Sequence, residues 1–190
     1  MSVLDIAAGG GALSIPAARM GADVLATDLS PTMLGLLERR AAAEGLAIRT
    51  AVMDGSKLAV GTQRYDRVCS EFGVMFFPDA GLPEMRRVMA PGGKAIVIIW
   101  GYPDNVPLTL YRVALERTLG ADGMPPEVAL VRDPDGLEPA LRRAGFGRVD
   151  RFTHTEPLAA TSGDDLWRWM SRVSPGYATF VANLTDDRRT

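Results

Sequence analysis

Short apolar runs alternate with amphipathic segments along the first hundred residues of the chain. The apolar runs predict strands at residues 3–8, 22–27, 46–52, 65–71 and 95–100. The segments between them predict helices at residues 12–20, 31–45 and 79–89. This alternation predicts an α/β fold, with a doubly wound, mostly parallel sheet and helices on both of its faces. Ligands bind such sheets at the carboxyl ends of the strands.

The last ninety residues follow a less regular pattern. They predict helices at residues 106–119, 136–145, 164–172 and 175–184. Between these helices, residues 148–156 predict a sixth strand. Pro91-Gly92-Gly93, just before the fifth predicted strand, is typical of a turn.

The composition excludes several classes of protein. With 190 residues, 47% of them hydrophobic and 23% charged, the chain is typical of one globular domain. A formal net charge of -2 argues against a nucleic-acid partner. Cys69 is the single cysteine, which excludes an internal disulfide and suits a reducing compartment. Because no basic leader opens the chain and no apolar run is long enough for a bilayer, we expect a cytoplasmic protein with no membrane partner.

Three glycines and one carboxylate indicate the class of ligand. Gly9-Gly10-Gly11 connects the first predicted strand to a helix, where backbone can approach a ligand closely. Asp28 ends the second predicted strand, where an acidic side chain can bind both ribose hydroxyls. Taken singly, the glycines could make only a turn and Asp28 could only cap a helix. Together they indicate a cofactor that contains adenosine.

Asp5 decides between two such cofactors, NAD and S-adenosylmethionine. A dinucleotide fingerprint has an apolar strand and a third spaced glycine, whereas here Asp5 lies inside the strand and Ser14 takes the third position. A degenerate match through Ala7, Gly9 and Ala12 leaves NAD open. A carboxylate inside a strand needs a cationic or amide partner.

The same segments resemble the class I S-adenosylmethionine-dependent methyltransferases, in the branch typical of ubiquinone and menaquinone biosynthesis. Val3–Gly11 is similar to their motif I, an acidic residue in a strand followed by a G-x-G-x-G loop, with Ala7 in place of the first glycine. The resemblance continues through residues 27–30, 53–54, 65–66, 70–77 and 84–93, in the order and spacing of the family. It covers about half of the chain.

The resemblance implies roles for individual residues. Gly9 and Gly11 would pack on the methionine part of S-adenosylmethionine and Asp28 would bind its ribose. Asp54 would meet the adenine amino group, with the ring between Leu29 and Met53. The expected cofactor-binding set is Asp5, Ala7, Gly9, Gly11, Asp28, Leu29, Met33, Met53, Asp54, Ser70 and Phe72. Asp54 could instead serve only an Asp-Gly turn, and Met33 and Met53 could instead be core residues.

We therefore interpret residues 1–102 as a Rossmann-like cofactor-binding core. Residues 103–190 would be the C-terminal part of the same domain, with helices, the sixth strand and a lid on the substrate side.

Methyl transfer from a sulfonium is an in-line displacement, so the protein mainly aligns the reactants and excludes water. Where the acceptor is a hydroxyl, a general base helps, and His154 and Glu71 are the candidates. A small, planar or lipophilic acceptor would fit a pocket of apolar side chains, unless these only pack in the core. They are Phe72, Val74, Met75, Phe76, Trp100 and Tyr102.

Two other functions stay open at this point. One is an NAD-dependent oxidoreductase, in which Tyr102 and His154 would have to act beside the nicotinamide. The other is a non-catalytic methyltransferase-like fragment or subunit. Only Met1 and Ser2 precede the first predicted strand, and no seventh strand of the family type follows Glu156. We therefore expect an open cofactor cleft, an exposed edge on the fifth strand and a homodimer.

Overall fold

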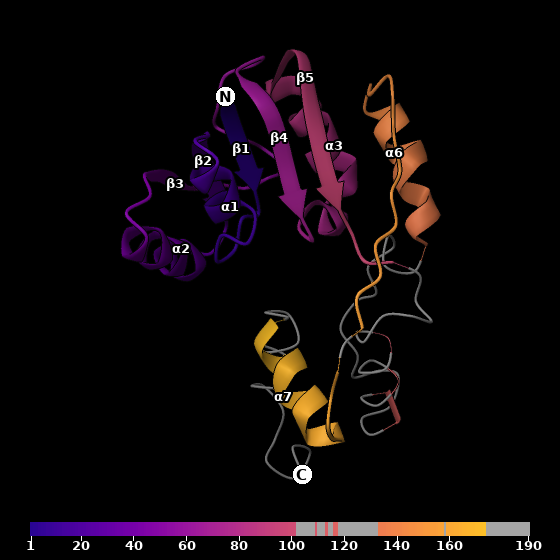
Figure 1. Ribbon diagram of the computed structural model, residues 1–190. Coiled ribbons are helices and arrows are strands. Elements are labelled where there is room, and N and C mark those ends of the chain that lie inside the picture. Colours follow the sequence, from indigo (N-terminus) through magenta and orange to yellow (C-terminus); the bar gives the residue numbers. More distant parts are fainter. Residues whose placement is uncertain (102–108, 110–112, 114–115, 118–132, 158, 174–190) are drawn as a thin grey trace. The chain divides into compact units, whose positions relative to one another are not determined.

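The computed structural model describes residues 1–101, 109, 113, 116–117, 133–157 and 159–173. The chain divides into two compact units (Figure 1). The core unit comprises residues 1–99 and 134–150, and the C-terminal unit comprises residues 100–133 and 151–190. The predicted helix at 175–184 lies outside the described residues, as does most of the one at 106–119.

A five-stranded sheet forms the centre of the core unit. Its strands are β1 (Ser2–Ile6), β2 (Asp23–Asp28), β3 (Ile48–Val52), β4 (Tyr65–Glu71) and β5 (Met89–Ile98). Their order is β3-β2-β1-β4-β5, and every neighbouring pair is parallel. The order reverses at β1, which gives the doubly wound topology expected from the sequence and opens a crevice at the carboxyl ends of the strands.

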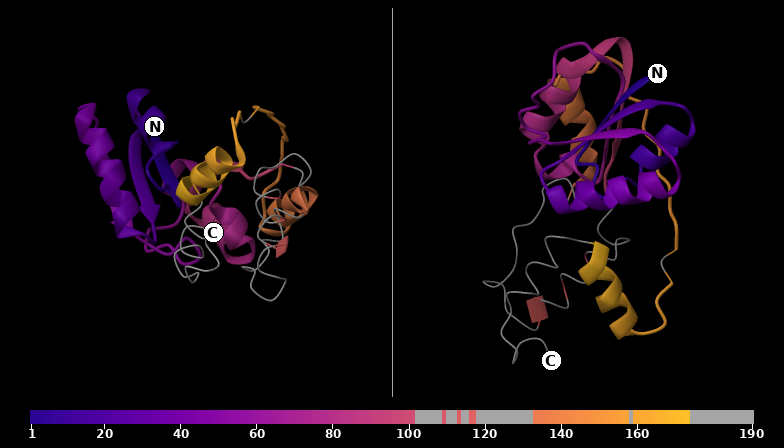
Figure 2. Two further views of the ribbon diagram at one scale, coloured as in Figure 1. Left: turned by 90° about the horizontal axis from the view of Figure 1, so that it is seen from below. Right: turned by 90° about the vertical axis from the view of Figure 1, so that its left-hand side faces the viewer.

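Helices cover both faces of this sheet (Figure 2). On one face lie α1 (Ser14–Arg19) and α2 (Pro31–Ala43). On the other lie α3 (Pro78–Val88) and α6 (Leu137–Arg143), which follow the short 3-10 helices η1 (Val74–Phe76) and η4 (Pro134–Gly136). Successive side chains of β2 point to opposite faces of the sheet and so contact both helical layers. Val24 packs toward α1, whereas Leu25 joins the main core cluster around α3.

The start of α2 fixes the loop after β2. Ser30 is its N-cap, and the Oγ of Ser30 accepts a hydrogen bond from the backbone N–H of Met33 at 3.3 Å. Leu34 and Leu37 are buried against the sheet, as their spacing predicts. The helix ends before Gly45, whose φ of 66° is the left-handed conformation of a C-cap glycine.

Two expectations for the later strands are wrong. Residues 148–157 form no strand, so the predicted sixth strand at Arg148–Glu156 is absent. Its apolar residues Val149 and Phe152 lie three positions apart, which does not give one apolar face to a strand, and Phe152 is 90% exposed. β5 begins at Met89 rather than Ala95, because residues 90–93 form an irregularity between the pairs Tyr65–Met89 and Arg67–Lys94.

The described part of the C-terminal unit contains α7 (Gly163–Val173), close to its predicted bounds. Within the described residues, none of the helices has the length and apolar character that crossing a bilayer requires.

Candidate functional site

A small pocket lies at the carboxyl ends of the first three strands. Its walls come from the loops after β1, β2 and β3 and from the residue that separates η1 from α3. The lining residues are Ala7, Asp28, Leu29, Met53, Gly55 and Phe77. Four of the six belong to the set predicted from the sequence, and they come together from three separate loops at the crevice of the sheet.

The Asp28 carboxylate joins two of these loops. Its Oδ2 accepts the backbone N–H of Gly9 at 2.8 Å, and its Oδ1 accepts the backbone N–H of Ser30 at 2.8 Å. Each carboxylate oxygen can accept two hydrogen bonds, so the half-buried carboxylate keeps acceptor capacity toward the pocket. This geometry allows Asp28 to hold the loop after β1 and to bind a diol at the same time.

The glycine loop needs left-handed backbone at three positions, since φ is 57° at Ala7, 52° at Gly9 and 87° at Gly11. A Cβ at Gly9 would meet only Cε of Met33, at 3.6 Å. A Cβ at Gly11 would lie 2.8 Å from Cγ of Leu37 in α2. Gly11 is therefore required for packing on α2, while Gly9 leaves room beside the predicted contact residue Met33.

Asp5 is 1% exposed, and its Oδ2 accepts a hydrogen bond from the Ser14 hydroxyl at 2.6 Å. The backbone amide of Ser14 also hydrogen-bonds the carboxyl, so Asp5 has an amide partner as expected, together with a hydroxyl. Burial raises the pKa of Asp5 to about 7, against the lowering effect of the Ser14 hydrogen bond, and the negative charge of Glu71 raises it further. Asp5 therefore ties β1 to the start of α1, beneath the glycine loop, and does not line the pocket.

Ser70 and Phe72 lie at the end of β4. The buried Ser70 hydroxyl donates to the Ile6 carbonyl at 2.9 Å and accepts the backbone N–H of Val74 at 2.9 Å, so it joins β1 to η1. Phe72 has a φ of 55° and donates its N–H to the Ile98 carbonyl at 2.8 Å. Non-glycine residues in this conformation are concentrated at functional sites, which keeps Phe72 a candidate for ligand contact.

Asp54 follows β3, and its Oδ1 accepts both the N–H of Ser56 at 2.8 Å and its hydroxyl at 2.7 Å. These bonds hold the pKa of the exposed Asp54 carboxyl below its usual value. The carboxylate thus organises a turn in this structure, and its predicted contact with an adenine amino group stays a prediction.

The two candidate bases belong to different units. Glu71 is half-buried at the end of β4 in the core unit. His154 belongs to the C-terminal unit, where its Nε2 lies 2.7 Å from Oε1 of Glu156 and both side chains are highly exposed.

The predicted acceptor pocket needs correction. Val74 and Met75 are 0% and 2% exposed, so they pack in the core instead of lining a cavity. Phe76 is 62% exposed beside them. Trp100 lies in the C-terminal unit, and Tyr102 lies outside the described residues.

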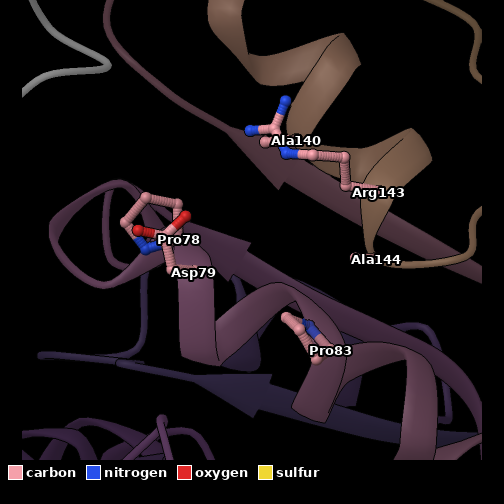
Figure 3. Close-up of a pocket in the computed structure, with 6 residues that line it drawn as sticks. All are labelled: Pro78, Asp79, Pro83, Ala140, Arg143 and Ala144. Carbon is pink, nitrogen blue, oxygen red and sulfur yellow. The ribbon is translucent and has the colours of Figure 1, made fainter.

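A second pocket lies on the helical layer, between α3 and α6 (Figure 3). It is lined by Pro78, Asp79, Pro83, Ala140, Arg143 and Ala144. None of these residues was predicted to bind a ligand, and the pocket is separate from the loops that carry Asp28 and the glycines.

The sequence analysis missed two residues that line the pocket, Gly55 and Phe77, and it also missed Gly73, which packs on the lining residue Ala7. A Cβ at Gly55 would lie 2.7 Å from Cζ of Phe77. A Cβ at Gly73 would lie 2.4 Å from Cβ of Ala7. Gly55 and Gly73 lie two or three positions after the ends of the predicted strands 46–52 and 65–71, and this position was the signal that could have identified them.

The comparisons with known proteins agree with this geometry. Residues 3–93 match the family model of a methyltransferase domain. The demethylmenaquinone methyltransferase of Thermus thermophilus is 32% identical over 161 residues, which cover 76% of this chain and 73% of that protein. The chain belongs to the class I S-adenosylmethionine-dependent methyltransferases. Their cofactor is S-adenosylmethionine, which removes the NAD-dependent oxidoreductase from consideration.

Two further comparisons show the extent of the similarity. An uncharacterized protein of Mycobacterium tuberculosis is 44% identical over 159 residues, or 79% of this methyltransferase chain. The aligned part covers 58% of that relative, so the chain spans less than two thirds of its length. The crystal structure of the YcgJ protein from Bacillus subtilis has the same fold, with a TM-score of 0.70 at 16% identity over 99% of this chain and 80% of that one.

Proposed function

We propose that this chain transfers a methyl group from S-adenosylmethionine to a small, planar or lipophilic molecule. The observation that carries the proposal is the position of Asp28, which lines the pocket at the crevice of the sheet while it accepts the Gly9 N–H at 2.8 Å. Membership in the family identifies the cofactor, and the pocket beside Asp28 supports the proposal that it binds there.

In this proposal six of the residues predicted from the sequence have a role in binding the cofactor. Asp28 accepts the ribose hydroxyls, and Leu29 and Met53 offer apolar surface to the two faces of the adenine. Asp54 accepts a hydrogen bond from the adenine amino group. Gly9 and Gly11 have no side chains, so the backbone of the glycine loop can approach the methionine part closely. When bound, the cofactor supplies an activated methyl group. The chain has to orient it toward the acceptor and exclude water.

The class of acceptor is inferred from a relative and from the end of β4. The Thermus thermophilus relative is named for demethylmenaquinone, a quinone, which supports a planar and lipophilic acceptor. The exposed Phe76 and the strained Phe72 would contact such a ring. Glu71, at the same strand end, would receive the proton that the acceptor loses when it forms its bond to the methyl group.

We also propose that the protein acts in the cytoplasm without a nucleic-acid partner and associates as a homodimer. The single buried Cys69 supports a reducing compartment. β5 is the last strand of the described sheet, and its Ile96 and Ile98 side chains are 46% and 39% exposed on one face, which supports self-association. Light scattering of the purified chain tests the dimer.

Two measurements test the function. In thermal unfolding, S-adenosylhomocysteine should raise the midpoint and NADH should not, because a ligand stabilises the state that it binds. In the second, metabolite extracts are incubated with the protein and methyl-labelled S-adenosylmethionine, and mass spectrometry identifies the labelled product. Stabilisation without any labelled product from quinone-containing extracts would favour the non-catalytic alternative. No stabilisation by S-adenosylhomocysteine would contradict the proposal.

A further inference from the structure

The outer side of the glycine loop is held by a side chain from α2. Arg40 lies in the last turn of this helix, and its Nη1 donates a hydrogen bond to the Gly10 carbonyl at 2.6 Å. The two residues are thirty positions apart in the sequence. Arginine on the exposed side of a helix ordinarily serves only solvation, so no sequence pattern singles out Arg40.

This contact fixes the orientation of one peptide group. A trans peptide is planar, so the carbonyl of Gly10 and the N–H of Gly11 point in opposite directions. Arg40 binds the carbonyl, and the N–H of Gly11 donates to the Ala8 carbonyl at 2.9 Å. Both ends of the peptide are therefore bound, although glycine on each side would otherwise let it rotate at little steric cost.

Each of the three glycines has its own anchor. The N–H of Gly9 is bound by Asp28, the carbonyl of Gly10 is bound by Arg40, and Gly11 packs against Leu37. All three anchors are connected to α2, since Asp28 also accepts the N–H of the Ser30 N-cap and the other two residues belong to the helix. The single helix α2 therefore fixes the position of the glycine loop relative to the Asp28 carboxylate at the end of β2.

We propose that Arg40 is a positioning residue for S-adenosylmethionine, acting through the Gly10 carbonyl and not through contact with the ligand. This inference rests on the proposed function. Without Arg40 the Gly10–Gly11 peptide has only one bound end, and the loop spends part of its time in orientations that do not accept the cofactor. Apparent affinity then falls in proportion to the competent fraction.

The test is calorimetric titration of the full chain with S-adenosylhomocysteine. Arg40→Met keeps the aliphatic stem and removes the donor, and we expect its Kd to rise about three- to tenfold, for a competent fraction of roughly a third to a tenth. The matched control is Arg39→Met, one position earlier on the same helix, whose guanidinium makes no hydrogen bond to the loop in the described structure. Its Kd should equal that of the wild type.

Two further measurements separate positioning from general stability. Arg40→Lys keeps one cationic donor for this single contact and should bind with intermediate affinity. The thermal midpoint of ligand-free Arg40→Met should match that of Arg39→Met, because Arg40 is exposed. Wild-type affinity in Arg40→Met, equal losses in both methionine variants, or no recovery in Arg40→Lys would overturn the inference. Failure of the wild type to bind S-adenosylhomocysteine would instead contradict the proposed function.

Discussion

The two halves of the sheet's carboxyl edge are built in different ways. At the ends of β1 and β2, the Asp28 carboxylate accepts hydrogen bonds from two loops and Arg40 donates one to the glycine loop. At the ends of β4 and β5, apolar side chains stay exposed, with Phe76 at 62% and Ile98 at 39%. In the proposed function, the half with fixed polar geometry would bind the cofactor that the family shares, and we call it the cofactor half. The other half would adapt to a variable acceptor.

The two halves meet at β1 and β4. Ser70 joins the Ile6 carbonyl to the start of η1, and Gly73 packs directly on Ala7. The backbone at this junction is strained on both sides, with φ values of 57° at Ala7 and 55° at Phe72. Substitutions at this junction and at neighbouring residues test how strongly the structure of one half depends on the other.

The largest expected effect concerns Asp5, beneath the cofactor half. Its folded pKa of about 7 lies above the ordinary value of 3.8, so the folded state holds the proton more tightly. Its contribution to stability is therefore complete below about pH 4 and is lost as pH rises through 7. Three pKa units correspond to roughly 4 kcal/mol. Urea unfolding between pH 4 and 8 should show this fall in the wild type and lose it in Asp5→Asn.

His154→Gln is the control for this pH series. The exposed imidazole lies in the C-terminal unit, so the variant should keep the wild-type fall in unfolding free energy. An equal fall in Asp5→Asn would show that the buried carboxyl does not cause the pH dependence.

The second effect tests the junction itself. Gly73→Ala places a methyl group where its carbon would lie 2.4 Å from Cβ of Ala7 and 2.9 Å from Oγ of Ser70. Neither atom is the end of a flexible side chain, so we expect a loss of about 2–3 kcal/mol of unfolding free energy. The double variant with Ala7→Gly should recover part of the loss. Additive effects in this double-mutant cycle would show that the two residues do not press on each other.

Much of the cofactor half could be predicted because its signals are local. The Ser30 cap, the glycine conformations and Asp28 at the strand end each depend on a few neighbouring residues. By contrast, Phe77 reaches the pocket because Gly55 and Gly81 leave space for its ring, which a Cβ added at either glycine would approach to 2.7 or 2.5 Å. That fit joins two segments that are distant in the sequence, so no local pattern predicts it.

The errors elsewhere in the chain also concern contacts between residues that are far apart in the sequence. Alternation in residues 148–156 was too weak to distinguish a strand from an extended segment, because a strand also needs a partner. β5 starts at Met89 because Met89 pairs with Tyr65 in β4 ahead of a bulge. These two residues are too far apart in the sequence for a local pattern to predict their pairing. Val74 and Met75 were predicted to line a pocket, but both are buried, and Val74 packs in one cluster with Leu82 and Met85 of α3.

The third prediction removes the polar centre of the cofactor half. Asp28→Ala should weaken binding of S-adenosylhomocysteine tenfold or more, because charge-assisted hydrogen bonds contribute about 1.5–3 kcal/mol each before water compensates. Asp23→Ala is a control at the opposite end of the same strand, where the carboxylate makes only an exposed ion pair with Arg49 in the described structure. Calorimetry should find its affinity unchanged. Equal affinities in both variants would remove Asp28 from the site.

The smallest effect isolates the strain at Ala7. Ala7→Gly restores the glycine of the family motif at a φ of 57°, where an alanine side chain is unfavourable. We expect the unfolding free energy to rise by roughly 0.5–1 kcal/mol, since the relief of strain exceeds the added entropy of the unfolded chain. Denaturant titration at constant pH measures this difference.

Gly21→Ala, just after the end of α1, is the opposite substitution: it adds a side chain at a positive φ instead of removing one. Gly21 has a φ of 80°, and nothing lies within 4 Å of a Cβ added there, so the substitution introduces backbone strain without a steric clash. The unfolding free energy should fall by about 1 kcal/mol. If Gly21→Ala is destabilising while Ala7→Gly is not stabilising, contacts of the Ala7 methyl group at the junction outweigh its strain. The stability of the loop after β1 would then depend on its packing against the segment after β4 as well as on the hydrogen bonds within the cofactor half.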